Sequence, residues 1–391
     1  MRDFLSKHAK EIKPSGIRKY FDLVESLPDA ISLGVGEPDF TTPWDVRSAA
    51  IRSLQKGYTQ YTGNRGLKEL RELTARYLEE RFGVESSPEH TIITIGASEG
   101  IDLALRATCE AGDEILIPDP AYVSYSPIVK LCGGVPVSVE CSAENGFILT
   151  PEAIERAVTK HTKSIIVAYP NNPTGGIMTR EQLEKIVPVI VKHDLLVISD
   201  EIYAELTYCG KHASVASLKG MRERTVLLGG FSKSFAMTGW RIGFASAPEA
   251  IDAAMLKIHQ YTALCAPRMS QHAAVAALSG GLKDGFTSVE SMRSEYDRRR
   301  RFLVKEFNDM GLSCFEPRGA FYAFPSVERT GMTGEEFANE LLKEEQVALV
   351  PGSAFGSCGI YHVRCSYATG MAELTEAVKR IARFVKNRTK N

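Results

Sequence analysis

The sequence lacks several features that would assign it to a particular class of protein. No apolar run approaches the roughly 18 residues that a membrane-spanning helix needs, and the charged N-terminal stretch has no apolar core that would indicate a secretory signal. Lys and Arg total 47 against 48 Asp and Glu, so the formal net charge of -1 provides no general attraction to nucleic acid or to an anionic membrane. We therefore expect a cytoplasmic protein without nucleic-acid or membrane partners.

Metal-binding and disulfide frameworks are also missing from the sequence. The eight cysteines are scattered, with no Cys-x-x-Cys pair and no zinc-finger spacing, and no His-x-x-x-His pair occurs. In a chain of this size, dispersed single cysteines are typical of buried thiols in a reducing compartment. We expect no metal site.

The first large region that the sequence does define runs from about residue 45 to residue 280. Short β-branched runs alternate there with stretches whose apolar residues recur every three or four positions. This alternation predicts an α/β fold with a mostly parallel central sheet and helices on both faces. The expected strands are Thr91–Ile95, Glu114–Ile117, Ser164–Ala168, Leu195–Ser199 and Thr225–Leu228, and the expected helices cover 65–82, 97–110, 122–132, 151–158 and 179–193.

The pattern changes after about residue 283, where strands and helices mix in the manner of a smaller α+β domain. We expect a long charged helix over 283–310, strands at Phe321–Phe324, Val347–Val350 and His362–Ser366, and helices near 333–343 and 371–387. Residues 1–30 read as a helical arm and a turn. Because 391 residues exceed one ordinary core, we expect an arm and part of the small domain over 1–45, a large domain over 46–282 and a small domain over 283–391.

Polar clusters follow the expected strands of the large domain. Ligands in open α/β sheets bind beyond the carboxyl ends of the strands, so these clusters are where we expect chemistry. They are Gly96-Ala97-Ser98, Asp119–Tyr122, Asn171–Gly175, Asp200–Tyr203 and Gly230–Lys233.

The segment Gly230–Gly243 carries the strongest functional signal. Lys233 follows an apolar run, and partial desolvation there would lower the pKa of its amine and make it a nucleophile toward an aldehyde. Ser232 and Arg241 could both reach an anion, and the planar guanidinium suits phosphate oxygens. An isolated Ser-Lys pair would more often indicate a surface lysine.

This segment resembles the lysine signature of class I pyridoxal-phosphate (PLP) aminotransferases, the aspartate aminotransferase-like branch of fold type I. Further matching segments in family order are Leu33–Phe40, Tyr58–Tyr61, Tyr169–Gly175, Ser199–Tyr203 and Val363–Tyr367. The resemblance covers nearly the whole chain. It implies transfer of an amino group between an L-amino acid (aspartate, aromatic or related) and a 2-oxo acid such as 2-oxoglutarate, by a ping-pong mechanism through Lys233.

The resemblance also implies which residues contact the cofactor ring. Lys233 would bind the cofactor aldehyde and shuttle the proton, and Asp200 would pair with the pyridine nitrogen and strengthen the electron sink. Tyr203 and Asn172 would hydrogen-bond the phenolic oxygen, while Tyr122 would stack on the ring. On its own, Asp200 reads equally well as a cap of the turn that follows its strand.

By the same resemblance, Gly96, Ala97 and Ser98 would bind the cofactor phosphate together with Ser232 and Arg241. Backbone amides at a helix N-terminus bind phosphate well, although Gly-Ala-Ser is equally typical of an ordinary N-cap.

The resemblance further implies an oligomer and a substrate site. Tyr61 would cross from a neighbouring subunit to the phosphate, so a homodimer is expected. Arg364 would hold the substrate α-carboxylate, with Gly36 close to the substrate because glycine allows the backbone to approach. Tyr122 and Asn172 would also contact the substrate.

Departures from the family pattern bear on specificity. Gly230 replaces a serine that the best-known aspartate enzymes carry three residues before the lysine, and Tyr122 replaces a tryptophan common in aspartate-specific members. No residue can be assigned to a distal substrate carboxylate. These differences weaken an assignment to aspartate and leave the amino donor open.

Two other functions remain compatible with the same motifs. A PLP-dependent β-lyase acting on cysteine- or cystathionine-type substrates would share the fold. A cofactor-binding regulator without turnover is disfavoured, because about 30 residues before the core are too few for a DNA-binding module.

Two further motifs are expected to have ordinary roles. The run Arg298–Arg301 is expected on a solvated helix face, since consecutive helical residues point about 100° apart. The sequence Leu33-Gly-Val-Gly-Glu-Pro lacks the third glycine of a dinucleotide fingerprint, so NAD binding is not expected.

Overall fold

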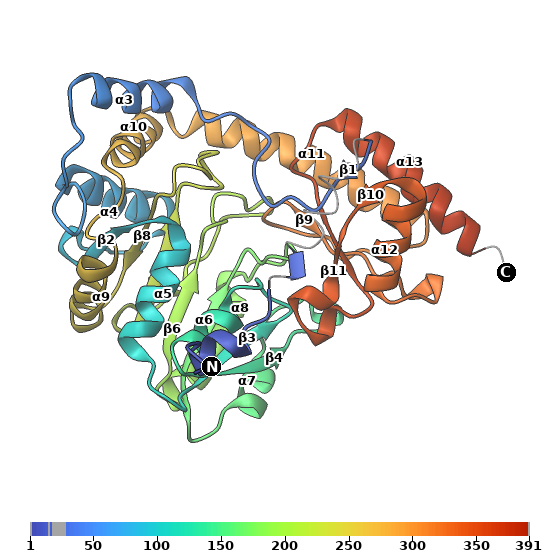
Figure 1. Ribbon diagram of the computed structural model, residues 1–391, viewed down its shortest axis with the longest axis horizontal. Coiled ribbons are helices and arrows are strands. Elements are labelled where there is room, and N and C mark those ends of the chain that lie inside the picture. The colour runs from blue at the N-terminus through green and yellow to red at the C-terminus, as the bar shows by residue number, and fades with distance from the viewer. Residues whose placement is uncertain (1, 15, 18–28, 390–391) are drawn as a thin grey trace.

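A seven-stranded sheet with the order β2-β8-β7-β6-β5-β3-β4 forms the centre of the larger part of the molecule (Figure 1). The computed structural model describes residues 2–14, 16–17 and 29–389. Neighbouring strands run parallel except β8, which is antiparallel to β2 and β7. The strands are β2 Thr91–Thr94, β3 Glu114–Asp119, β4 Val135–Glu140, β5 Thr162–Ala168, β6 Leu196–Asp200, β7 Thr225–Gly230 and β8 Gly243–Ser246. The predicted mostly parallel sheet is confirmed.

Two strands of this sheet have no counterpart among the expected ones, for a reason visible in their composition. β4 lies at the sheet edge, has one fully buried residue, Val139, and contains Pro136 and Ser138, so it presents no continuous apolar run. β8 is only Gly-Phe-Ala-Ser and contains no β-branched residue.

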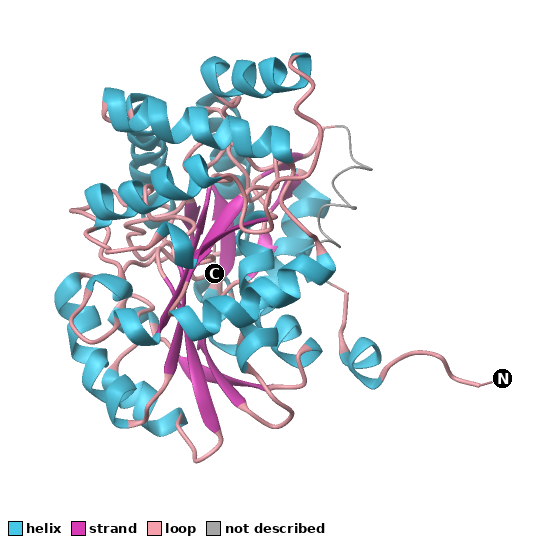
Figure 2. Ribbon diagram, turned by 90° about the vertical axis from the view of Figure 1, so that its left-hand side faces the viewer, coloured by secondary structure: helices cyan, strands magenta, loops and turns pink. Residues whose placement is uncertain are grey.

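Helices cover both faces of the sheet, as predicted (Figure 2). Alternate side chains of β5 show the two faces: Ile165 and Val167 pack with the core under α7 and α8, whereas Ile166 packs with the core under α5, α6 and α9. The first face also carries α3, α4 and α10 over the β8 end. These helices are α3 Trp44–Gln55, α4 Lys68–Phe82, α5 Gly96–Thr108, α6 Tyr125–Leu131, α7 Pro151–Ala157, α8 Arg180–Lys192, α9 Glu249–Thr262 and α10 Arg268–Asp284.

The smaller part combines short strands with long helices. β9 Tyr322–Ala323, β11 Val350–Pro351 and β12 Val363–Ser366 form an antiparallel sheet, and β1 Ile31–Ser32 pairs in parallel with β10 Val347–Ala348. The N-terminal segment thus enters this part, after α1 Lys7–Glu11, which lies beside α6 (Figure 1). The expectation for residues 18–28 falls outside the described residues. The helices here are α11 Thr287–Asp309, α12 Gly334–Glu345 and α13 Met371–Arg388.

Short 3-10 turns connect the main elements of both parts. They are η1 Pro88–His90, η2 Ala143–Asn145, η3 Val215–Ser217, η4 Arg222–Arg224, η5 Glu328–Thr330, η6 Gly352–Phe355 and η7 Ser357–Gly359. Within the described residues, no helix combines the length and the apolar character that crossing a membrane requires.

The long helix expected over 283–310 begins later than the sequence suggested. Gly285 ends α10 with a left-handed φ of +73°, and α11 starts at Thr287. Glycine adopts this conformation without steric cost, which makes it a common helix terminator.

The expectation of a solvated face for Arg298–Arg301 is wrong for half of the run. Arg299 and Arg300 are buried. Four consecutive residues span more than one helical turn, so on a helix packed against the core some of them face inward. Their charges are paired: Arg299 Nη1 donates to both carboxylate oxygens of Asp39 at 2.9 Å, and Arg300 Nη1 donates to Glu316 at 2.9 Å. These contacts attach α11 to the chain on either side of it.

Asp119, at the end of β3, joins the two parts of the molecule. Its buried carboxylate accepts hydrogen bonds from the Ser357 amide (3.0 Å), the Ser357 hydroxyl (2.8 Å) and the Cys358 amide (3.2 Å). A Cβ at Gly356, whose φ is +143°, would lie 2.0 Å from an oxygen of this carboxylate. The absence of a side chain at Gly356 therefore allows the contact.

Candidate active site

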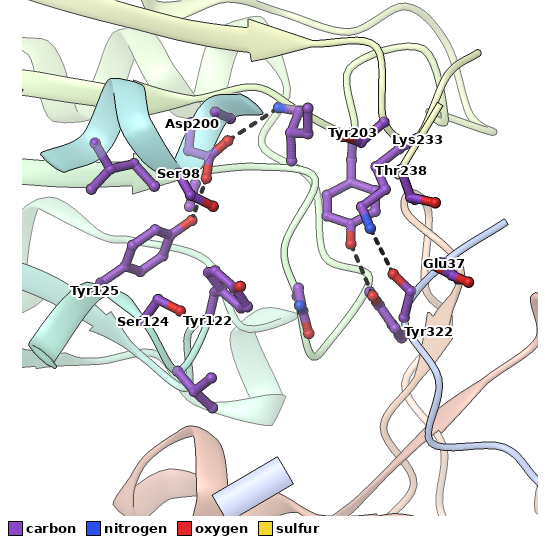
Figure 3. Close-up of a pocket in the computed structure, with 18 of the residues that line it drawn as sticks. Glu37, Ser98, Tyr122, Ser124, Tyr125, Asp200, Tyr203, Lys233, Thr238 and Tyr322 are labelled. Atoms are coloured by element: carbon purple, nitrogen blue, oxygen red, sulfur yellow. Dashed lines mark hydrogen bonds between the residues drawn. The ribbon is translucent and has the colours of Figure 1, made fainter. Parts of the chain in front are cut away.

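A cavity of about 590 Å³ lies where the carboxyl ends of the large sheet meet the smaller part. Parallel pairing places Asp200 opposite Ala168 and Leu228, so the ends of β5, β6 and β7 share one edge. Figure 3 shows side chains from these strand ends facing the cavity. Of the residues proposed from the sequence, the lining includes Gly36, Ala97, Ser98, Tyr122, Asn172, Asp200, Tyr203, Ser232, Lys233, Arg241 and Arg364.

Lys233 lies in the turn that follows β7 and extends its amine into the cavity. Its Nζ donates a hydrogen bond to the Gly36 carbonyl at 2.6 Å (Figure 3). Burial lowers the pKa of Lys233 to about 8, Glu37 opposes this shift and the nearby charge of Arg364 adds to it. About a tenth of the amine is therefore unprotonated at pH 7, and this fraction is available as a nucleophile or base.

Asp200 ends β6 and is only 6% exposed. The hydroxyl of Tyr125 donates to one carboxylate oxygen at 2.8 Å, and the Ile202 amide donates to the other at 3.2 Å (Figure 3). Burial raises the pKa of Asp200, while the bond from Tyr125 acts against this. The result is a fixed, poorly solvated acid that can pair with a protonated ring nitrogen.

Two tyrosines share a hydrogen bond on the opposite wall. The hydroxyls of Tyr203 and Tyr322 are 2.8 Å apart, and burial raises the pKa of Tyr203 well above its usual range. The Tyr322 hydroxyl would lie 2.6 Å from a Cβ at Gly36, so a side chain there would displace it. Gly36 thus lets the N-terminal segment approach this wall closely.

Arg364 projects from β12 and is 2% exposed. Its Nη1 donates to Asn172 Oδ1 at 2.9 Å and its Nη2 donates to the Gly34 carbonyl at 2.5 Å. The guanidinium also lies over the ring of Tyr322, 4.5 Å from the centroid. Within the described part of the chain its Nε has no hydrogen-bond partner, so the buried cation retains capacity for a carboxylate.

The opposite end of the cavity has the features of an anion site. α5 begins at Gly96, whose φ is +74°, and a Cβ there would lie 2.7 Å from Arg241 Nη2. A Cβ at Gly243 would similarly lie 2.8 Å from the Ala97 amide nitrogen. Ser98 and Arg241 are exposed to the cavity mouth. Free amides of a first helical turn beside a guanidinium favour a phosphate group.

The family model for aminotransferase class I and II matches residues 28–381. The chain belongs to this family. It is 45% identical over 379 residues to an aspartate aminotransferase of Pyrococcus abyssi, covering 96% of this chain and 97% of that protein. It is 44% identical over 386 residues to aromatic-amino-acid aminotransferase 2 of Thermococcus litoralis, covering 98% and 99%. The aspartate aminotransferase structure from Thermus thermophilus with maleate matches with a TM-score of 0.93 and 37% identity, covering 98% and 100%.

The aminotransferase is therefore a PLP-dependent enzyme of fold type I, as the resemblance in its motifs implied. The cavity fits the cofactor on its own geometry. Lys233 supplies an amine of lowered pKa, Asp200 supplies a buried acid, and the cradle at Gly96 excludes a Cβ where a phosphate needs room.

Two residues assigned from the sequence, Gly96 and Tyr61, do not line the cavity of this aminotransferase chain. Gly96 is buried at the start of α5, directly before the lining residues Ala97 and Ser98. Tyr61 is 77% exposed, and its loop is anchored by the Asn64 side chain, which donates to the Leu264 carbonyl at 2.9 Å. Tyr61 was expected to act on a neighbouring subunit, so its role stays a prediction.

Several residues that line the cavity of the aminotransferase were absent from the sequence-based site. Tyr125 and Tyr322 contact predicted residues directly, and Glu37 and Thr238 also line the cavity. Tyr125 sits in a helix and Tyr322 in the apolar Phe-Tyr-Ala-Phe run, where an aromatic reads as core. Glu37 lies within the motif Leu33–Phe40, which was recognised in the sequence. Its acidic side chain was the signal that could have marked it as a candidate site residue.

Proposed function

We propose that this aminotransferase moves an amino group between an L-amino acid and a 2-oxo acid, such as 2-oxoglutarate, by a ping-pong mechanism. The observation that carries the assignment of roles is a lysine of lowered pKa and an acid of raised pKa lining one cavity. PLP, when bound, supplies the electron sink that makes the α-proton of the substrate removable.

Lys233 acts as the proton carrier. In its unprotonated form the amine would take the proton from the substrate α-carbon and deliver it to the C4′ carbon of the bound cofactor, and the reverse transfer would form the new amino acid from the 2-oxo acid. Its position beside Gly36 keeps it on the wall that faces the substrate. The pKa of about 8 allows both steps near neutral pH.

Asp200 holds the ring nitrogen in its protonated form, with its orientation set by Tyr125. Tyr203 and Asn172 hydrogen-bond the phenolic oxygen, and Tyr122 stacks on the ring face. Every one of these side chains lines the cavity.

The phosphate is held by the first turn of α5, where Gly96, Ala97 and Ser98 present backbone amides, and by Ser232 and Arg241. Arg241 would supply a permanent positive charge, and its planar guanidinium suits phosphate oxygens. The substrate α-carboxylate binds at the opposite end, on Arg364 and with Gly36 and Asn172 close by.

The amino donor is aspartate, an aromatic amino acid or a related compound, and the names of the relatives include both of the first two. Mixing the enzyme with single L-amino acids and following the colour of the bound cofactor identifies the donor in one half-reaction. A donor should bleach the colour without an oxo acid, and 2-oxoglutarate should restore it. Release of pyruvate and ammonia without an oxo acid would instead identify a β-lyase.

We also propose a cytoplasmic homodimer in which Tyr61 reaches the neighbouring site, and domain limits of 1–45, 46–282 and 283–391. Mixed dimers of Lys233→Ala and Tyr61→Ala subunits test the crossing. If Tyr61 serves its neighbour, one site of each mixed dimer has both wild-type residues and activity returns. If activity stays at the level of the separate variants, Tyr61 does not cross.

A further inference from the structure

A Glu–His pair, in which the histidine is buried and the glutamate is partly buried, lies directly behind the phosphate end of the cavity. Glu99 follows Ser98 in the first turn of α5, and its Oε2 accepts a hydrogen bond from the Ile95 amide at 2.5 Å. Its Oε1 is 2.8 Å from Nδ1 of His259, which projects from α9. His259 is 0% exposed. The pair therefore connects the start of α5 to a neighbouring helix.

The hydrogen-bond pattern indicates which ring nitrogen of His259 donates to Glu99. A carboxylate accepts only, so Nδ1 of His259 carries the hydrogen that Glu99 receives. Nε2 is buried without a partner among the described residues, and an N–H there would remain unsatisfied. His259 is therefore a directional donor to Glu99 through Nδ1.

The anchored backbone is the backbone that precedes the phosphate cradle. Ile95 is the N-cap residue of α5 and its own side chain makes no capping bond, so Glu99 is the group that fixes this amide. The next residues are closely packed: a Cβ at Gly96 would lie 2.7 Å from Arg241 Nη2, and a Cβ at Gly243 would lie 2.8 Å from the Ala97 amide nitrogen. Because this turn is closely packed, a displacement of the Ile95 backbone would also displace the amides of the following residues, which face the proposed phosphate site.

We propose that His259, acting through Glu99, is a positioning residue for the cofactor phosphate. The proposal rests on the phosphate site proposed above. The proposal also explains how an unfavourable interaction is limited. The Glu99 carboxylate lies in the same helical turn as the proposed phosphate site, so it repels a bound anion. Holding Glu99 on Ile95 and His259 keeps that charge turned toward α9 while it supports the cradle.

A matched pair of variants separates the hydrogen bond from the shape of the side chain. In His259→Asn, the side-chain amide nitrogen takes the place of Nδ1 and can still donate to Glu99. In His259→Leu, a methyl group of the same shape cannot. The holoenzyme of each variant is diluted with a PLP scavenger, and the rate of cofactor release is followed with the phosphorus-31 resonance of the bound phosphate.

The expected result is release about tenfold or more faster in His259→Leu, the loss expected for one hydrogen bond to a charged group, with a displaced phosphorus resonance. His259→Asn should restore the rate to within about threefold of wild type. The loss should appear in cofactor retention far more than in turnover at saturating PLP. The control is His193→Leu, which breaks another Glu–His pair, with Glu155 at 3.0 Å, remote from the cavity, and should leave release unchanged.

Wild-type release from folded His259→Leu, or equal impairment of the Leu and Asn variants, would overturn the proposal. If His259→Leu does not fold, Glu99→Ala decides instead, at high salt where the repulsion is screened: faster release supports the proposal and unchanged release overturns it. Arg241→Ala shows whether a negative result concerns His259 alone or the proposed phosphate site itself. If that variant also retains PLP like wild type, the phosphate site itself is misassigned; if it releases PLP faster, only the role of His259 is wrong.

Discussion

The two ends of the cavity differ in the burial of their polar and charged side chains. At the phosphate end, Ser98 and Arg241 are exposed, and the anion site consists of backbone amides and a guanidinium whose charge is permanent. At the acid–base end, Asp200 and Tyr203 are buried, and burial moves the pKa of Lys233 down to about 8. The acid–base groups are therefore buried, whereas at the proposed phosphate end Ser98 and Arg241 stay close to solvent and Ser232 is buried.

The buried end requires more partners than the exposed end. Each of its polar side chains has a specific neighbour: Tyr125 for Asp200, Tyr322 for Tyr203 and the Gly36 carbonyl for Lys233. An unsatisfied buried polar group costs about 1–3 kcal/mol, so these neighbours are needed for stability as well as for orientation. Substitutions at the two ends should therefore differ in kind: loss of rate at one and loss of cofactor retention at the other.

The largest effect is expected from Lys233→Ala. Without the amine the proposed proton carrier is lost, and the rate of the half-reaction should fall by about 10⁴-fold or more. The measurement is single-turnover transamination at saturating PLP. A wild-type rate in this variant would break the comparison, because the buried end would then not hold the proton carrier.

A smaller loss is expected from Asp200→Asn, which keeps the shape but removes the charge that favours a protonated ring nitrogen. Removing such a preorganised electrostatic partner should lower kcat by about 10²–10³-fold. Asp194→Asn is a suitable control, because Asp194 is an exposed acid paired with Arg224 at 2.9 Å. Equal kinetics in the two variants would contradict the role of burial at Asp200.

The pH dependence of cofactor uptake sharpens the comparison further. The pKa of Lys233 is lowered, so the reactive unprotonated amine predominates above about pH 8 and is about a tenth of the total at pH 7. The rate of PLP addition to cofactor-free enzyme should rise about tenfold from pH 7 to its plateau. Stopped-flow absorbance gives this profile. A plateau reached only near pH 10 would show that burial does not act on this lysine.

The smallest effect is expected from Tyr125→Phe. The Tyr125 hydroxyl counteracts the rise in the pKa of Asp200, so its removal should raise that pKa further and reduce kcat by a few-fold. A spectroscopic pH titration of the bound cofactor should shift in this variant. No shift would indicate that the hydrogen bond only supports the fold.

Much of the fold and of the candidate site could be predicted from the sequence because both carry local signals. Continuous β-branched runs indicated β5, β6 and β7, and their ends carry Asn172, Asp200 and Lys233 within recognisable motifs. β8 could not be predicted, because its four residues Gly-Phe-Ala-Ser carry no local strand signal. Their strand conformation depends on pairing with β2 and β7 on either side. Tyr125 and Tyr322 were missed for a related reason: their hydroxyls become functional only through partners 75 and 119 residues away.

The contact at Asp119 has a mechanical consequence for the enzyme. The stretch gripped by its carboxylate lies a few residues before β12, the strand that carries Arg364, whereas the phosphate cradle belongs wholly to the large sheet and its helices. Asp119 thus connects the large sheet to the segment before β12. If Arg364 binds the substrate and α5 the cofactor phosphate, as proposed, loss of the Asp119 carboxylate should weaken substrate binding more than cofactor retention.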